Sequence, residues 1–288
     1  MINIDYKKPE SMEEAFGLLK EYGPDGRLIA GGTDVMIKLK EGRISPRCLI
    51  SLRHLKGLDH ITEQDGELRI GSMVTHRMLE VSTLIRKKYP IIIDAVSNIG
   101  SVQIRNVATV GGNIVNAVPS ADSAIPLITL GAEVRMKGPK GERSMPLTDF
   151  FIGPGETRLE PDEIVMEFVI PRLPPHTGGA YCKHTRRAAM ELPILGVAVQ
   201  VSLEADMKTC LDARIGLGVL APIPMRAKNA EAILKGKKLD DKVLSEAGTA
   251  AAKECKARDS VRGRAWYRKD MVEVLVRRMA KLAIERAG

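Results

Sequence analysis

Two double-glycine segments have the residue types and the spacing best suited to binding a ligand. They are Ala30–Asp34 (AGGTD) and Thr109–Asn113 (TVGGN), and apolar residues precede each. Paired glycines let a backbone approach a ligand closely, and successive N–H groups can form a nest for an anion. Thr33, Thr109 and Asn113 add side-chain donors. Two such segments that converge would suit a pyrophosphate; the alternative is two tight turns that require a left-handed backbone.

A third glycine pattern, Gly216–Ala221 (GLGVLA), fits the GxGxxA motif of dinucleotide-binding folds, but we reject it as a nucleotide site. That site needs a helix to begin at the motif, with its N-terminus on the pyrophosphate. Pro222 and Pro224 follow at once and forbid this helix. A plain strand is predicted here instead.

Other polar residues are weaker candidates. Asp34, Asp122 and Glu191 lie near turns, where acidic residues most often act as caps. The five histidines show no i,i+4 ligand spacing, so no metal site is predicted. One basic cluster is either an ordinary surface feature or a source of positive charge for a reduced cofactor; it comprises Lys183, Arg186 and Arg187.

Composition argues against a nucleic-acid binder. Aromatic residues make up 3% of the chain, too few for platforms on which bases stack. The net charge of +8 is uneven, because Lys253–Gly288 holds eleven Lys or Arg against five Asp or Glu. This excess indicates either an anionic partner or, more commonly, a solvated helix face.

The cysteine pattern and the hydropathy indicate a cytosolic, reduced protein. The four cysteines form no CxxC pair, so neither a local zinc or iron–sulfur site nor a secreted disulfide framework is expected. Met1–Pro9 lacks the apolar region of a signal peptide. The longest apolar stretch, around Leu192–Val201, is far shorter than the ~20 residues that span a bilayer.

Periodicity and capping signals predict an α+β protein. The first helix begins at Ser11, spaced for a capping box with Glu14, and ends at Gly23. A turn-rich run is expected over Arg105–Asn113, and Pro171–Gly179 is the best domain boundary. Further helices are predicted over Thr75–Tyr89, Ile91–Ile99, Ala124–Gly131, Leu239–Lys256 and Asp270–Ala287. Strands are predicted over Arg27–Ala30, Cys48–Leu52, Leu68–Ser72, Glu133–Lys137 (before a hairpin turn), Ile164–Ile170, Ile194–Leu203 and Ala213–Leu220.

The last predicted helix has two specific features. Asp270 and Glu273 stand in capping-box spacing at its start. Its apolar face is predicted to comprise Met271, Val274, Leu275, Met279 and Leu282.

Three blocks carry a resemblance to a known family. Ile29–Asp34 (IAGGTD), Gln103–Asn113 (QIRNVATVGGN) and Pro119–Asp122 (PSAD) resemble the FAD-binding medium subunit of the molybdenum hydroxylases. This family includes the flavoprotein subunit of carbon monoxide dehydrogenase and the FAD domain of xanthine dehydrogenase. Asp259–Arg268 resembles the family's DxRxxxxYR segment, and the likeness runs in order over nearly the whole chain.

The resemblance implies an FAD-binding domain of the vanillyl-alcohol oxidase type over residues 1–175, with subdomains of about 1–57 and 58–175. A smaller α+β domain of sheet and helices would occupy residues 176–288. One FAD segment would wrap the pyrophosphate and adenosine side: Leu28, Ile29, Ala30, Gly31, Gly32, Thr33, Asp34 and Val35. The second would supply another pyrophosphate turn: Ala108, Thr109, Val110, Gly111, Gly112 and Asn113.

The resemblance also implies contacts with the remainder of the cofactor. Asp122 would bind a polar group, Val165 would contact the ring and Lys183 would lie near the isoalloxazine. Ile99 falls where some relatives place an aromatic residue against FAD. Arg186 or Arg187 with Glu191 resembles an Arg–Asp pattern near the flavin of relatives, but the acid here is Glu and the spacing differs by one.

The function that the resemblance implies is electron transfer within a multi-subunit, heterohexameric oxidoreductase. A large partner subunit would hold molybdopterin and a small one would carry 2Fe–2S clusters, since this chain has no cluster ligands. FAD would pass the electrons to an external acceptor. Two alternatives stay open: a stand-alone flavin reductase or oxidase of the same fold, and a non-enzymatic anion or nucleic-acid binder built on the basic C-terminus.

Overall fold

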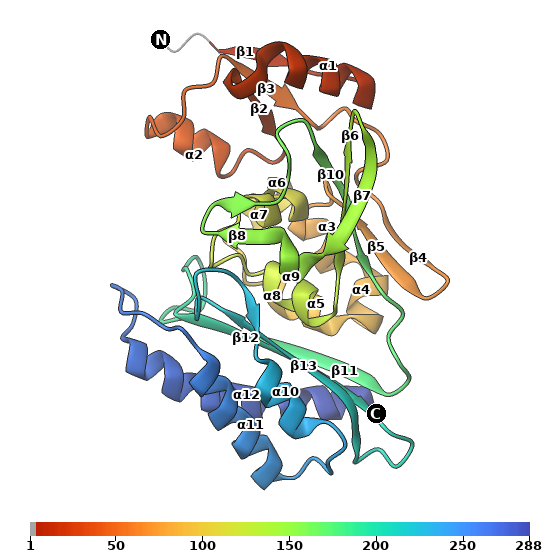
Figure 1. Ribbon diagram of the computed structural model, residues 1–288, viewed down its shortest axis with the longest axis vertical. Helices are drawn as coiled ribbons and strands as arrows, with labels where there is room; N and C mark the ends of the chain where they lie inside the picture. Colours follow the sequence, from red (N-terminus) through yellow and green to blue (C-terminus); the bar gives the residue numbers. More distant parts are fainter. Residues whose placement is uncertain (1–3) are drawn as a thin grey trace.

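The computed structural model describes residues 4–288 and consists of three successive tiers (Figure 1). The first tier contains a three-stranded parallel sheet in the order β1-β3-β2. Its strands are β1 (Asp5–Lys7), β2 (Gly26–Ile29) and β3 (Cys48–Ser51), and its helices are α1 (Met12–Tyr22), the 3-10 turn η1 (Gly23–Asp25) and α2 (Val35–Lys40).

The N-terminal helix α1 begins and ends where the sequence predicts. The Ser11 side chain accepts a hydrogen bond from the Glu14 N–H, and Gly23 is the C-cap. The return bond of the capping box differs, because the Glu14 carboxylate accepts from the Glu10 N–H rather than from that of Ser11. Helix α2 and strand β1 were not predicted.

The second tier is built around a five-stranded antiparallel sheet in the order β4-β5-β10-β6-β7. Its strands are β4 (Ile61–Gln64), β5 (Glu67–Gly71), β6 (Glu133–Gly138), β7 (Gly141–Pro146) and β10 (Ile164–Ile170). A small pair, β8 (Phe151–Gly153) and β9 (Glu156–Thr157), is added. Its helices are α3 (His76–Val81), α4 (Thr83–Lys88), α5 (Pro90–Val96), α6 (Val102–Val107), α7 (Val110–Val115), α8 (Ala124–Thr129) and α9 (Leu147–Phe150).

Two predictions for this tier are wrong. The single helix predicted over Thr75–Tyr89 is two helices, because Ser82 ends α3 and its hydroxyl caps α4 by accepting from the Ile85 N–H. The run over Arg105–Asn113 is not a set of turns. It ends α6 and begins α7, and Gly111 and Gly112 lie in the first turn of α7.

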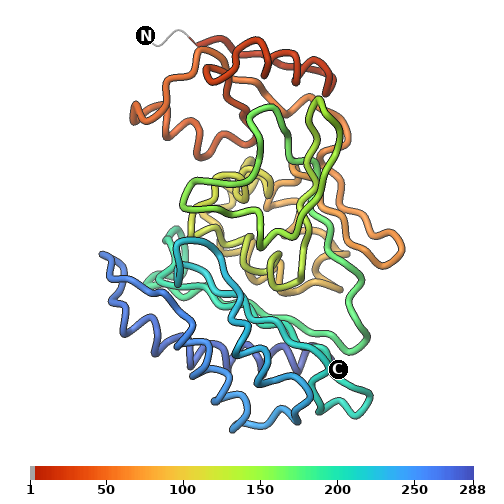
Figure 2. The backbone as a smooth tube through the Cα atoms, in the orientation of Figure 1, coloured from red at the N-terminus to blue at the C-terminus, as the bar shows by residue number. Residues whose placement is uncertain are grey.

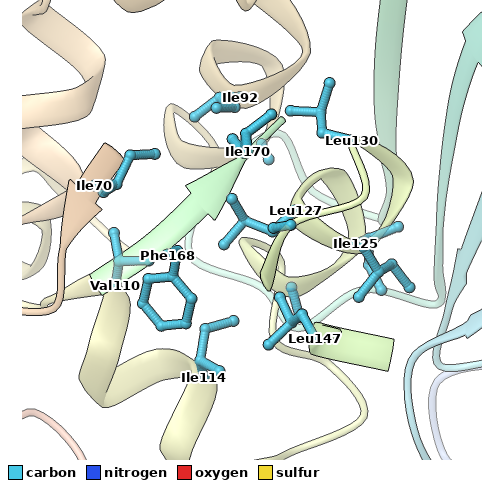
Figure 3. Close-up of a cluster of buried hydrophobic side chains, with 14 of the residues drawn as sticks. Ile70, Ile92, Val110, Ile114, Ile125, Leu127, Leu130, Leu147, Phe168 and Ile170 are labelled. Carbon is cyan, nitrogen blue, oxygen red and sulfur yellow. The ribbon is translucent and has the colours of Figure 1, made fainter. Parts of the chain in front are cut away.

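The core of the second tier lies between the sheet and these short helices. Figure 3 shows Ile70, Phe168 and Ile170 of the sheet beside Val110 and Ile114 of α7. All five side chains are 0% exposed, so folding removes their whole apolar surface from water. The buried contacts fix α7, and with it the second double-glycine segment, against the sheet.

The third tier is a four-stranded antiparallel sheet with helices beneath it (Figure 1). The strand order is β11-β12-β13-β14, with β11 (Thr177–His184), β12 (Leu195–Leu203), β13 (Cys210–Gly218) and β14 (Met225–Arg226). One face packs on α5 and α8; the other packs on α10 (Lys228–Leu234) and α12 (Ala265–Ala287), with α11 (Asp241–Glu254) against those helices. The glycine pattern Gly216–Ala221 opens in strand β13, as predicted.

The start and the apolar face of the last helix differ from prediction. Helix α12 begins at Ala265, so Asp270 lies inside it and forms no capping box. The buried face is Val272, Leu275, Val276, Ala280 and Ala283, with Met271 and Met279 at its margin. A glycine of α11 allows close packing on α12, because a Cβ on Gly248 would lie 2.7 Å from the Glu273 carbonyl oxygen. The tube in Figure 2 shows that the first described residues belong to the first tier, whereas the C-terminus lies in the third tier.

The four cysteines are free thiols in different parts of the fold. Cys48 lies in β3, Cys182 in β11, Cys210 in β13 and Cys255 at the end of α11. Burial raises the pKa of all four thiols, that of Cys210 to about 11 and that of Cys255 to about 12. Within residues 4–288, no helix is both long and apolar enough to cross a bilayer.

Candidate functional site

The fold brings the two double-glycine segments together between the first and second tiers. A Cβ on Gly31 would lie 2.0 Å from the carbonyl oxygen of Val107, at the end of α6. A Cβ on Gly112 would lie 4.0 Å from that of Ala30. The first segment therefore rests directly on the backbone that leads into α7, and only glycine at position 31 allows this contact.

The first segment carries a row of free donors. The backbone N–H groups of Gly31, Gly32, Thr33 and Asp34 have no hydrogen-bond acceptor within residues 4–288. Gly32 has φ +79°, in the left-handed region, whereas Gly31 does not. Because these residues are at most partly exposed apart from Asp34, the row needs a ligand or water to satisfy it.

Side chains hold this first segment from outside. Asn116, the C-cap of α7, donates to an Asp34 carboxylate oxygen at 2.8 Å and accepts from the Lys38 ammonium at 2.7 Å. Arg53 reaches the Ala30 carbonyl oxygen at 3.4 Å. Of the flanking residues that the sequence assigns to FAD, Leu28 and Val35 are partly buried and Ile29 is buried in a small cluster with Leu39 and Leu49.

Most N–H groups of the second segment already donate hydrogen bonds to other groups of the protein. The Val110 N–H donates to the Val74 carbonyl and the Gly111 N–H donates to the Ser72 carbonyl, both at 2.9 Å. The Gly112 N–H donates to the Thr109 hydroxyl at 3.0 Å. What remains for a ligand is the Thr109 N–H and the side-chain amide of Asn113, whose oxygen accepts from Ser123 at 2.5 Å.

The second segment is nevertheless built on glycine for a packing reason. A Cβ on Gly111 would lie 2.6 Å from the Ser72 carbonyl oxygen. Ser72 in turn donates its N–H to Met166 of strand β10 at 2.9 Å. The glycine therefore places α7 against the central sheet, and neither Gly111 nor Gly112 has a left-handed backbone.

A buried histidine fixes the entry to the second segment. The His76 Nδ1–H and the His76 backbone N–H both donate to the Ala108 carbonyl, at 2.9 Å and 3.0 Å. His76 is 0% exposed, and its Nε2 has no partner within the described residues. Burial lowers the pKa of His76 to about 4, so the ring is neutral at neutral pH.

Asp122 and Lys183, which the sequence assigns to FAD separately, form a buried pair. One Asp122 oxygen accepts from the Tyr181 hydroxyl and the other from the Lys183 ammonium, both at 2.8 Å. The two charged side chains are 7% and 6% exposed. Burial raises the pKa of Asp122 and the adjacent ammonium opposes this rise. Lys183 also donates to the Asn98 carbonyl at 2.9 Å, so it links β11 to the segment after α5, next to Ile99.

The remaining assigned residues lie at different depths. Ile99 is partly buried, and its carbonyl accepts from Arg105 at 3.0 Å. Val165 is 4% exposed inside the core of the second tier, paired with Met136, so its side chain does not reach the surface. The Arg186 guanidinium donates to one Glu191 carboxylate oxygen at 2.8 Å, whereas that of Arg187 lies 4.0 Å away. The backbone N–H groups of both arginines donate to the other carboxylate oxygen at 2.8 Å.

Sequence reasoning missed several residues that shape the site. Glu80 holds Arg105 by two contacts of 3.1 Å, and burial of this pair anchors α6 to α3. Asn116 had a usable signal, since it lies one helical turn after Asn113 on the same helix. His76 and Ser72 had none, because their role depends on a long-range contact with α7. The other missed residues are Lys38, Arg53 and Ser123.

Two family models match the chain. Residues 2–173 match the FAD binding domain in molybdopterin dehydrogenase, and residues 180–283 match the CO dehydrogenase flavoprotein C-terminal domain. The fold and these matches define a flavoprotein with an FAD-binding domain followed by a C-terminal domain of sheet and helices. The predicted α+β class is thereby confirmed.

Curated relatives match over nearly their whole length. The xanthine dehydrogenase FAD-binding subunit of Escherichia coli O157:H7 is 34% identical and covers 98% of this chain and 97% of that protein. The carbon monoxide dehydrogenase medium chain of Afipia carboxidovorans is 33% identical over 99% and 98% of the two chains. The solved structure of carbon monoxide dehydrogenase from Hydrogenophaga pseudoflava superposes with TM-score 0.94, at 31% identity over 99% of both chains.

This chain therefore belongs to the FAD-binding subunits of the molybdenum hydroxylases, as the sequence resemblance predicted. It is a flavoprotein subunit of an oxidoreductase, and FAD is the cofactor of its family.

Proposed function

We propose that this chain is the electron-transfer subunit of a molybdenum hydroxylase complex, with FAD held between its first two tiers. The observation that carries the proposal is the row of free N–H groups at Gly31, Gly32, Thr33 and Asp34. Successive backbone donors without acceptors suit the oxygens of a pyrophosphate, the central part of FAD. The backbone of Val107 and Ala108, which leads into the second segment, approaches Gly31 closely, and this contact supports a shared site for both segments.

The protein's own residues would bind, orient and shield the cofactor. The four N–H groups of the first segment would hold the pyrophosphate, and Thr109 and Asn113 would add donors from the opposite tier. The Asp122–Lys183 pair, with the Lys183 bond to the Asn98 carbonyl, holds β11 against the second tier beside the proposed ring end of the FAD site. Bound FAD supplies redox chemistry that can pass electrons between one-electron and two-electron partners.

The partners follow from the family and from the chain's own chemistry. Relatives are named medium chains or FAD-binding subunits. We infer a large subunit that binds molybdopterin, a small subunit with 2Fe–2S clusters, and an external acceptor. The dispersed cysteines of this chain support this division, since Cys48, Cys182, Cys210 and Cys255 lie in four different elements and form no cluster site.

The cofactor site is tested with two glycine variants of equal backbone strain. Gly32 has φ +79° and Gly42 has φ +68°, but Gly42 lies beyond α2 with nothing within 4 Å of an added Cβ. Both Gly32→Ala and Gly42→Ala should lose about 1–2 kcal/mol of stability, the usual cost of a left-handed alanine. Only Gly32→Ala should weaken FAD binding, by about tenfold or more, measured by fluorescence titration of the purified full chain.

The electron-transfer role needs a separate measurement. The flavin of the lone chain should stay oxidised with substrates such as xanthine, and should be reduced only when the partner subunits are present. Substrate-dependent bleaching by the lone chain would favour the stand-alone reductase or oxidase. Equal FAD affinity of both glycine variants, or a wild-type chain that binds no FAD, would contradict the proposed site.

A further inference from the structure

A large cavity lies away from the proposed FAD residues, at the seam between the second and third tiers. Its volume is about 770 Å³, and none of the eighteen residues assigned to FAD lines it. The lining comes from β4, the turn before β5, the end of α4, the start of α5, the connection 172–176, strands β11 and β12, and the end of α12. In Figure 1 this connection descends from β10 to β11, and the C-terminus lies near its lower end.

The cavity wall is strongly basic. Its charged residues are Lys87, Lys88, Arg172 and Arg286 against the single carboxylate of Glu63. Lys88 is paired with Glu63 at 2.6 Å, and Arg286 is paired with Asp94 at 2.6 Å. Lys87 and Arg172 are exposed, and within residues 4–288 neither forms an ion pair, unlike Lys88 and Arg286. An anionic ligand would satisfy these two charges.

The side-chain oxygen of one buried amide that lines the cavity has no hydrogen-bond partner. Gln200 of strand β12 is 3% exposed, and its Oε1 has no hydrogen-bond partner within the described residues. Gly179 stands opposite it on β11 and places no side chain over it. A buried polar atom without a partner is costly, so this position suits a ligand that donates a hydrogen bond.

The other side of the cavity is apolar. Ile91, Leu130 and Leu173 line it together with Tyr89, which is 4% exposed. Cavities of about 300–1,000 Å³ that combine apolar walls with a few polar groups are typical of small-molecule sites. The combination of two free cations, one unpartnered amide and an apolar wall fits a molecule with a charged head and a flat apolar body.

We propose that this cavity binds a small organic phosphate of about mononucleotide size. The phosphate would lie on Lys87 and Arg172, a neutral donor group would meet Gln200, and a ring would pack on the apolar wall. The site is separate from the proposed FAD site and does not depend on it.

The binding test uses the full chain saturated with FAD, so that a probe cannot occupy the adenosine part of the cofactor site. AMP, adenosine and inorganic phosphate are titrated by calorimetry. We expect AMP to bind at least about tenfold more tightly than either adenosine or phosphate. Absent AMP binding, or adenosine binding as tight as that of AMP, would overturn the proposal.

Two variants locate the binding. Arg172→Gln removes an exposed charge and should weaken AMP binding about tenfold; Lys242→Gln, an exposed lysine of α11 outside the cavity, is the matched control and should change nothing. Gln200→Met removes the unpartnered amide. It should weaken AMP binding to a similar degree while the thermal midpoint stays equal or rises, because no internal hydrogen bond is lost. Unchanged AMP affinity in both cavity variants would place the binding elsewhere and overturn the proposal.

Discussion

The two double-glycine segments look alike in sequence, yet the fold uses them differently. In Gly31–Asp34 the backbone N–H groups are free, and the segment is held by outer side chains such as Asn116. In Val110–Gly112 the N–H groups are used by Val74, Ser72 and Thr109, and the glycines allow packing on the sheet. The same motif therefore serves as a donor row in one tier and as a structural joint in the next.

The largest effect is expected at Gly31, which both offers a free N–H group and allows close packing on the neighbouring backbone. A Cβ would lie 2.0 Å from the Val107 carbonyl oxygen, which is backbone and cannot yield without moving α6. Gly31→Ala should cost about 3 kcal/mol of unfolding free energy and weaken FAD binding about a hundredfold. Denaturant melts and FAD titration measure both quantities. Gly17→Ala in α1, with nothing within 4 Å of its Cβ, is the control and should leave FAD affinity unchanged.

Gly111→Ala should separate folding from binding. Its Cβ would lie 2.6 Å from the Ser72 carbonyl oxygen, so we expect a loss of about 3 kcal/mol in stability. Because its N–H already donates to Ser72, the folded fraction should keep FAD affinity within a few-fold. Equilibrium unfolding followed by FAD titration checks this. A loss of affinity as large as that of Gly31→Ala would mean that the two segments act alike.

The entry to the second segment should be sensitive to acid through His76. Its pKa is lowered to about 4 in the folded chain, against an ordinary value of 6.5, because it is buried. The unfolded chain therefore binds more protons between these pH values, and stability is full above pH 6.5 and falls as pH drops towards 4. The loss should reach about 2 kcal/mol at about pH 5. Chemical denaturation at several pH values measures this slope.

His76→Asn is expected to flatten that pH dependence, whereas His54→Asn, at an exposed position, should keep it. Equal slopes in the wild type and in His76→Asn would assign the acid sensitivity to other groups.

The smallest effect is expected at Asn116, which braces the first segment from outside. Asn116→Ala removes its bonds to Asp34 and Lys38 and should cost about 1 kcal/mol of stability. FAD affinity should fall by a few-fold, since the donor row itself is unchanged. The same titration and melts measure this variant. A loss as large as that of Gly31→Ala would show that the outer brace, and not the backbone contact, fixes the donor row.

Local signals predicted much of this fold. Ser11 and Gly23 mark both ends of α1, and the turn at 138–141 marks the β6–β7 hairpin. Long-range contacts account for the errors. Helix α12 begins five residues before the capping pair at Asp270, because its first turns are held by Arg268, whose guanidinium donates to the Ile194 and Val219 carbonyls.

The site was predictable where it depends on local residue types, and was not predictable where it depends on long-range contacts. The residue types in Ala30–Asp34 and Thr109–Asn113 indicate donors and close approach, and the fold places the two segments in contact. Sequence spacing gives no sign that the Gly111 N–H is already used by Ser72, or that Asp122 and Lys183 neutralise each other. Pairings across 61 residues, as in that ion pair, depend on the tertiary arrangement alone.

The burial of three of the four thiols has a consequence for the chemistry that the chain tolerates. Thiolate, not thiol, reacts with peroxides and alkylating agents. With a pKa of about 11, Cys210 is ionised in only on the order of one molecule in ten thousand at neutral pH, and Cys255, with a pKa of about 12, still less. The buried thiols of Cys48, Cys210 and Cys255 should therefore resist oxidation and maleimide labelling in the folded chain, and labelling of these three would report unfolding.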